Sequence, residues 1–103
     1  MKVSLGPYPK RCSKRKVSIK IDKWDCYDVA HTLSIIIVPL LTKYRSLRSG
    51  HPCGISEERW DTILVKMIYA FQKIAEDKEV IEHTKEVKNG MRLFIKYFHH
   101  LWY

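Results

Sequence analysis

Residues 56–76 read SEERWDTILVKMIYAFQKIAE, and large apolar side chains recur in this segment at spacings of three and four. That spacing places them on one face of an α-helix and predicts that this face packs on a core. The predicted core residues are Trp60, Leu64, Met67, Phe71 and Ile74. Ser56 supplies a capping hydroxyl, and Glu57 and Glu58 lie at the positive end of the helix dipole. The segment therefore predicts a helix that begins at Ser56 and runs to about Glu76.

A second amphipathic helix is expected before it, over residues 28–48. Its apolar stripe, which we expect to face the core, consists of Val29, Leu33, Ile36, Leu40, Tyr44 and Leu47. Asp25 or Asp28 can cap the start of this helix. Pro39 lies inside the pattern and removes one backbone hydrogen bond, so a kink is predicted near Ile35.

A third helix is expected from about Lys78 to Leu101, again with apolar residues three and four apart. Its stripe consists of Val80, Thr84, Val87, Met91, Phe94, Phe98 and Leu101. Asn89-Gly90 is a weak point, since glycine costs about 1 kcal/mol relative to alanine inside a helix, and we expect a bend there. Short connections favour antiparallel neighbours. The predicted fold class is mainly α, an antiparallel three-helix bundle.

The N-terminal residues favour a short β-hairpin attached to this bundle. Val17, Ile19 and Ile21 alternate with polar residues, which is the pattern of a half-buried strand. Residues 2–5 can pair with that strand, because the Gly-Pro-Tyr-Pro sequence of residues 6–9 has turn chemistry. The hairpin would display the basic residues that follow the turn at its tip.

Length and composition set the domain organisation. A chain of 103 residues, 46% of them hydrophobic, suffices for one modest core, so we expect a single domain. Within it, residues 1–23 form a basic arm or hairpin and residues 24–103 form the helical bundle. The longest apolar run, residues 35–41, is far shorter than the roughly 20 residues of a membrane span. We therefore expect no membrane association.

Three cysteines, Cys12, Cys26 and Cys53, are expected to remain free thiols. They cannot all pair with one another, and the residues before them lack the apolar segment of a secretory signal, which favours a reducing compartment. Their spacing also lacks the short pairs that are typical of structural zinc sites. Neither a metal nor another cofactor is expected.

The charge of the chain is concentrated at its N-terminal end. Nineteen Lys and Arg against eleven Asp and Glu give a net charge of +8, and residues 1–23 alone hold eight basic residues against the single acid Asp22. The candidate binding residues of this arm are Lys10, Arg11, Lys14, Arg15, Lys16, Lys20 and Lys23. Such a cluster is either a solubilising loop or a surface that seeks phosphates or an acidic protein.

Two further groups of residues extend this hypothesis. Lys43, Arg48 and His51 follow one another at the end of the predicted first helix and beyond. If this region meets the arm, the two together would form an anion-binding pocket that fits a nucleotide phosphate. Tyr8 and Trp24 flank the basic cluster, and aromatic residues among cations suit the stacking of single-stranded nucleic acid.

Catalysis has one candidate pair, Asp28 and His31, which lie three residues apart and therefore on one helical face. The carboxylate could orient the imidazole there. No activated nucleophile, phosphate-binding loop or metalloprotease motif accompanies the pair. The favoured interpretation of His31 is a hydrogen-bonded contact between helices, and we expect no enzymatic activity.

Several segments together resemble a group of small uncharacterised proteins that is widespread in tailed bacteriophages. They are IDKWD (21–25), AHTL (30–33), IIVPLL (36–41), GHP (50–52), RWDTIL (59–64), MIYAF (67–71) and LFIKYFHHLW (93–102). The chain resembles a short member, because longer relatives carry an acidic insertion between the Gly-x-Pro turn and the Arg-Trp-Asp helix. The resemblance implies phage origin and action in the bacterial cytoplasm.

These observations lead to one functional expectation and two alternatives. We expect a non-enzymatic phage accessory protein, active in counter-defence or host takeover, that binds an anionic partner stoichiometrically through the basic arm. The partner would be nucleic acid, a nucleotide messenger or an acidic host protein. The first alternative is a structural or assembly protein of the virion that forms a homo-oligomer. The second is a small enzyme that acts on a nucleotide through Asp28 and His31.

Overall fold

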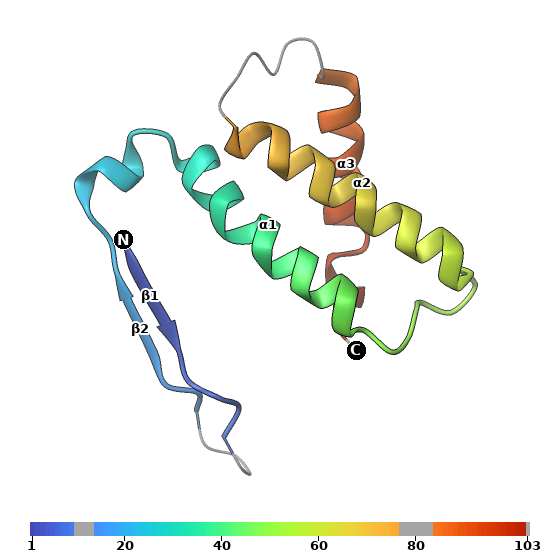
Figure 1. Ribbon diagram of the computed structural model, residues 1–103, viewed down its shortest axis with the longest axis horizontal. Helices are drawn as coiled ribbons and strands as arrows, with labels where there is room; N and C mark the ends of the chain where they lie inside the picture. Colours follow the sequence, from blue (N-terminus) through green and yellow to red (C-terminus); the bar gives the residue numbers. More distant parts are fainter. Residues whose placement is uncertain (10–13, 77–83, 103) are drawn as a thin grey trace.

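The computed structural model describes residues 1–9, 14–76 and 84–102 of the chain. It is mainly helical, with three helices that pack together and a two-stranded antiparallel hairpin at the N-terminus (Figure 1). The predicted fold class is thereby confirmed. The elements are β1 (Lys2–Leu5), β2 (Val17–Lys20), the 3-10 turn η1 (Lys23–Cys26), α1 (Val29–Leu47), α2 (Glu57–Ala75), α3 (Thr84–Lys96) and the 3-10 turn η3 (Phe98–His100).

Helix α2 lies at the centre of the bundle and packs against both α1 and α3. Its predicted stripe is confirmed, since Trp60, Leu64 and Met67 are fully buried and Phe71 is nearly so. The Ser56 hydroxyl accepts a hydrogen bond from the backbone N–H of Arg59 at 3.2 Å, which is the expected N-cap. Helices α1 and α2 run in opposite directions side by side (Figure 1).

Helix α1 turns a different face to the core from the one predicted. Ser34 and Leu41 are its buried residues. The predicted core stripe is wrong in that Val29, Leu33, Leu40 and Leu47 are all exposed. The physical reason is that α1 is apolar nearly all round, so its periodicity does not select a face. Ser34 is small and its hydroxyl donates to the carbonyl oxygen of Ala30 at 2.7 Å, which lets α2 approach without an unsatisfied polar group.

Helix α3 continues through the predicted weak point and ends earlier than predicted. Gly90 lies inside the helix, and buried Val87 and Leu93 flank it. The helix ends at Lys96, and the residues that follow form η3, so the predicted continuation to Leu101 is wrong. The turn is held by the hydroxyl of Tyr44, which donates to backbone carbonyls at the C-terminal end of the chain. The predicted start near Lys78 lies outside the described residues.

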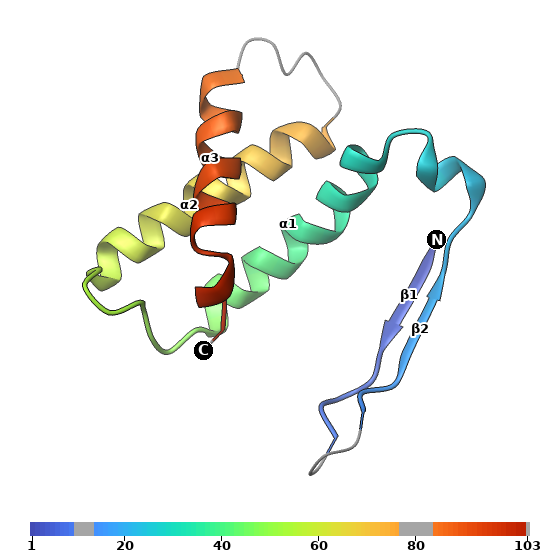
Figure 2. The same cartoon turned by 180° about the vertical axis from the view of Figure 1, so that it is seen from behind.

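The hairpin stands clear of the bundle. In Figures 1 and 2 it projects from the N-terminal end of α1, on the side that faces away from α2. Every residue of both strands is exposed, so the predicted half-burial of β2 is wrong, because no helix of the described residues covers it. The radius of gyration of 15.4 Å exceeds the roughly 13 Å of a compact domain of this length, as a projecting hairpin requires.

A network of polar contacts fixes the base of the hairpin to the start of α1. The N-terminal ammonium of Met1 lies 3.1 Å from a carboxylate oxygen of Asp22 and 3.1 Å from one of Asp25. The Asp25 carboxylate also accepts the backbone N–H of Asp22 at 2.8 Å. The backbone carbonyl oxygen of Asp25 accepts a hydrogen bond from the hydroxyl of Thr32 in α1 at 2.7 Å.

Among the described residues, no helix is both long and apolar enough to span a membrane.

Candidate functional site

The hairpin separates its side chains onto two faces. In the antiparallel register, Lys2 pairs with Lys20 and Ser4 with Ser18, whereas the intervening pairs are apolar. The pairing continues one step beyond the strands, because Gly6 N–H donates to the carbonyl oxygen of Lys16 at 2.9 Å. A Cβ at Gly6 would lie 3.4 Å from the Lys16 Cβ, which places the two residues on one face. We call Lys2, Ser4, Lys16, Ser18 and Lys20 the basic face of the hairpin.

The basic face holds like charges in direct opposition. Lys2 and Lys20 are cross-strand partners, and like charges placed opposite each other destabilise a strand pair. Lys16 adds a third cation, and the two serines between them are neutral. This face therefore carries a charge of +3 with no acid to offset it. An anion that bridges the lysines would relieve their repulsion.

At the tip of the hairpin, an arginine lies over an exposed aromatic ring. The guanidinium of Arg15 is 4.6 Å from the ring centroid of Tyr8, and its Nε donates to the carbonyl oxygen of Gly6. Tyr8 is 83% exposed, so much of its ring remains open to solvent. Lys14 beside it is also exposed. The tip thus combines cations and an aromatic surface, while the predicted site residues Lys10 and Arg11 lie outside the described residues.

The other predicted stacking residue lies at the opposite end of the hairpin. Trp24 is exposed and belongs to η1, which follows the end of β2 that carries Lys20. Lys23 is exposed on the same turn. Figure 1 shows this turn at the base of the hairpin, so the fold separates Trp24 from Tyr8 by the length of the strands.

The basic residues at the end of α1 are engaged by acids of the bundle. The guanidinium of Arg45 makes two hydrogen bonds to the Asp61 carboxylate, at 2.7 and 2.9 Å. Arg48, with a side chain only 8% exposed, lies 3.4 Å from the same carboxylate and 4.0 Å from that of Glu57. These contacts, that of Arg45 first, lower the pKa of Asp61 below its ordinary value. Arg48 is therefore neutralised inside the protein.

The structure does not bring the arm to this region. Lys43 is exposed on α1, and His51 is exposed on the loop after it. His51 lines a small cleft of about 110 Å³ together with its neighbours Gly50 and Pro52 and with His100 and Trp102 from the C-terminal end of the chain. The strands of the hairpin begin beside the N-terminal end of α1 and stand apart from the C-terminal end of that helix (Figure 1). The pocket that would have joined Lys43, His51 and the arm is not formed by the residues that the structure describes.

Asp28 and His31 both have structural contacts. The Asp28 carboxylate accepts the backbone N–H of His31 at 3.1 Å and so caps α1. The His31 Nδ1 atom lies 3.5 Å from the carbonyl oxygen of Ile74 in α2, at the outer limit of a hydrogen bond. The favoured interpretation of His31 as a contact between helices is confirmed.

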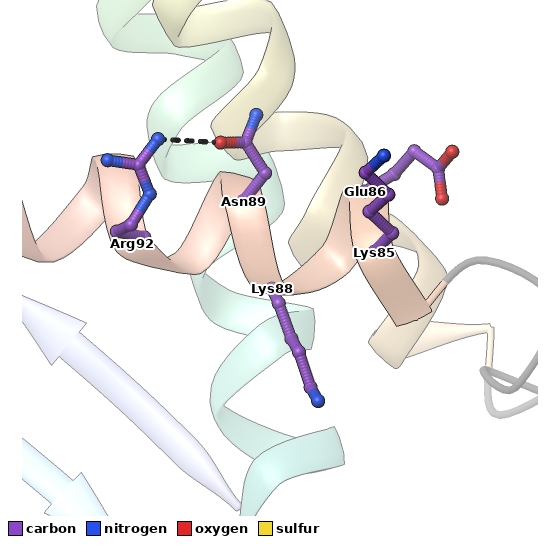
Figure 3. Close-up of a pocket in the computed structure, with 5 residues that line it drawn as sticks. All are labelled: Lys85, Glu86, Lys88, Asn89 and Arg92. Carbon is purple, nitrogen blue, oxygen red and sulfur yellow. Dashed lines mark hydrogen bonds between the residues drawn. The ribbon is translucent and has the colours of Figure 1, made fainter.

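A row of cations on α3 was missed in the sequence. Lys85, Lys88, Arg92 and Lys96 follow one another at spacings of three and four, which could have revealed a basic helical face. A shallow cavity of about 440 Å³ lies over the first three, with Glu86 and Asn89 (Figure 3). Arg92 donates to the side-chain oxygen of Asn89 at 2.8 Å, and Lys88 points away from both. All of these lining residues come from one helix, and their cations do not converge.

The cysteines are the remaining reactive side chains that the sequence singled out. Cys26 and Cys53 are free and exposed, and Cys12 lies outside the described residues. Within the described ranges, no group of three or more His, Cys, Asp or Glu side chains is placed to hold a metal ion. Comparison with protein families, with curated proteins and with solved structures gives no match to this chain.

Proposed function

We propose that the protein is a non-enzymatic binder of single-stranded nucleic acid, which it holds along the basic face and the tip of the hairpin. The observation that carries the proposal is the direct pairing of Lys2 with Lys20 on a face without acids. A run of phosphates would neutralise that face and release condensed counterions. Tyr8, beneath the Arg15 guanidinium, would offer its open surface to a base.

The hairpin is favoured over the cation row of α3 for two reasons. The α3 cations are mixed with Glu86, and Arg92 already has a partner on its own helix. The hairpin also projects from the bundle, so a strand of nucleic acid can reach it without contact with the acids of α2. A row of lysines on an exposed helix face needs only solvent to explain it.

Stoichiometric binding of this kind would let a small protein act by occupancy. In an infected bacterium, coverage of single-stranded nucleic acid would block enzymes that process it, in keeping with the phage accessory role that the resemblance implies. Counter-defence and host takeover both belong to this proposal.

The test is the salt dependence of affinity for a fluorescently labelled single-stranded oligonucleotide, measured by anisotropy. Neutralisation of Lys2, Lys16 and Lys20 together to Gln should weaken binding at low salt. It should also reduce the slope of log K against log salt by about 2, since each phosphate contact contributes roughly 0.7 on single strands. Circular dichroism should show an unchanged helical spectrum, because no helix of the described structure packs on the strands that carry these lysines.

A charge-matched control distinguishes the loss of a binding site from the loss of net positive charge. Neutralisation of Lys85, Lys88 and Arg92 to Gln removes the same three charges from α3 and should leave the slope close to that of the wild type. If this control loses the affinity while the hairpin variant keeps it, the site is on α3 and the proposal fails. The proposal also fails if the wild-type protein does not bind the oligonucleotide at low salt.

A further inference from the structure

Helix α1 carries an apolar surface that nothing in the described structure covers. The surface consists of Val29, Leu33, Ile36 and Leu40, which we call the outer face of α1, and exposed Lys43 bounds it at its C-terminal end. Three of the four apolar residues are more than half exposed, and Leu40 reaches 64%. The outer face lies beside the side of α1 that packs on α2, because Leu40 is one residue, or roughly 100° of helix rotation, from buried Leu41. A helix that is apolar on more than one side is ordinarily buried on more than one side.

The outer face continues into a groove between α1 and α3. Leu33 lines one cavity of about 310 Å³, together with Phe71 of α2 and Phe94 of α3. Leu40 lines a second cavity of about 360 Å³, which also includes Phe94. The exposed stripe and the groove thus form one apolar surface along the helix. Contiguous exposed surfaces of this kind mark interaction sites.

The composition of α1 points to a partner that carries the same surface. Residues 29–42 contain no Asp, Glu, Lys or Arg, although the whole chain has a net charge of +8. At an interface between identical subunits related by a two-fold axis, a surface meets itself, so any charge near the axis faces its own sign. An uncharged face is the part of a strongly basic protein that can do this without repulsion. Interface cores are also depleted of charged residues, because burial of an unpaired charge is costly.

The spacing along the outer face fits a helical partner. Its four residues are separated by four, three and four positions, as in the a and d positions of a coiled coil, and Lys43 ends this apolar run. We infer that the outer face of α1 packs against the outer face of α1 in a second copy of this chain, in a two-fold dimer. The association buries the exposed leucines of both copies and uses no residue of the basic face of the hairpin. It does not depend on nucleic-acid binding.

Sedimentation equilibrium over a range of protein concentrations, without nucleic acid, tests the inference. The wild-type chain of 12.3 kDa should sediment with twice that mass as the concentration rises. Leu40→Lys should weaken the dimer by more than about tenfold, because it places like charges at a desolvated interface. Since Leu40 is mostly exposed in the monomer, the substitution should leave the helical circular dichroism unchanged.

Val65→Lys is the matched control, because Val65 is an exposed apolar residue of α2 outside the outer face. It should sediment as the wild type does. A wild-type protein that remains monomeric at high concentration would overturn the inference, and so would equal weakening by the two substitutions. If Leu40→Lys does not fold, Leu33→Gln provides the second variant, with loss of dimerisation expected and retention of the dimer contradicting the inference.

Discussion

Gly90 of α3 lies against Ala70 of α2, so closely that a Cβ added to Gly90 would overlap the Cβ of Ala70. The same atom would stand 2.5 Å from the backbone carbonyl oxygen of Lys66. Ala70 is itself completely buried. Two of the smallest residues of the bundle therefore meet where α2 and α3 cross. The glycine that looked like a weak point in the sequence is what allows the two helices to approach.

Gly90→Ala is expected to destabilise the protein. In an unobstructed helix this change would raise stability by about 1 kcal/mol. Here the new methyl group collides with the backbone of α2, and overpacking of this kind costs roughly 1–3 kcal/mol. Urea denaturation measures the difference. A second substitution, Ala70→Gly, should restore only part of the loss, because the Lys66 carbonyl remains in place.

Gly50→Ala is the control for this comparison, since nothing lies within 4 Å of a Cβ at that position. Its stability should be unchanged or raised by up to about 1 kcal/mol. Gly90→Ala with the stability of the wild type would contradict the close approach of α2 and α3.

Asp61→Asn is expected to lower stability at neutral pH by roughly 1 kcal/mol, because it removes the partner of Arg45 and Arg48. These arginines hold the pKa of Asp61 below its ordinary value in the folded protein. The charged Asp61 carboxylate therefore contributes to the free energy of unfolding above about pH 4, the pKa of an Asp in the unfolded chain. This contribution is lost as the pH falls through the pKa of Asp61 in the folded protein. Denaturation curves of the variant and the wild type should converge in acid.

Glu57→Gln is the control for Asp61→Asn. Glu57 is exposed and lies 4.0 Å from Arg48, so its removal should change stability little at any pH. A gap between Asp61→Asn and the wild type that stays constant from neutral to acid pH would show that the charge of Asp61 does not stabilise the fold.

Asp25→Ala is expected to release the hairpin from the bundle. The Asp25 carboxylate accepts the backbone N–H of Asp22, and this bond is the main reason that its pKa is lowered. Backbone amides of β1 and β2 should exchange with solvent faster in the variant, whereas those of α2 should not change. In the wild type, hairpin protection should fall as acid protonates Asp25, because a lowered pKa means that the charged form holds the contact.

Asp28→Ala tests the specificity of that result. Asp28 caps α1, so its loss should cost about 1 kcal/mol of helix stability and leave exchange in the hairpin unchanged. Equal exchange behaviour of the two variants in β1 and β2 would contradict the assignment of Asp25 as the anchor.

Tyr8→Ala is expected to weaken binding to single-stranded oligonucleotides by roughly 5- to 150-fold, the range for loss of one stacked base. Tyr8→Trp should retain the affinity, since it keeps an aromatic surface beneath Arg15. Trp24 lies at the other end of the hairpin, so Trp24→Ala should change the affinity measured by anisotropy little. A loss of affinity in Trp24→Ala that equals the loss in Tyr8→Ala would place the stacking elsewhere.

The sequence was sufficient to predict the elements whose apolar pattern is compatible with only one arrangement. Helix α2 is apolar on one side and polar on the other, so its periodicity alone assigns Trp60, Leu64 and Met67 to the core, where they are found. The strands of the hairpin follow from alternation and from the turn residues between them. The basic arm followed from counting charges, because repulsion among neighbours does not depend on the fold.

Tertiary structure decided what depends on contacts between distant segments. The apolar surface of α1 offers two faces, and only the position of α2 settles that Leu41 is buried while Leu40 is exposed. Arg48 looked available for a ligand until the fold placed Asp61 beside it. Where the local pattern offers more than one apolar face or more than one ionic partner, the choice depends on another part of the chain, and the local pattern does not contain it. For this protein, the sequence determined which segments form helices and strands, and the packing around α2 determined which of their surfaces remain free.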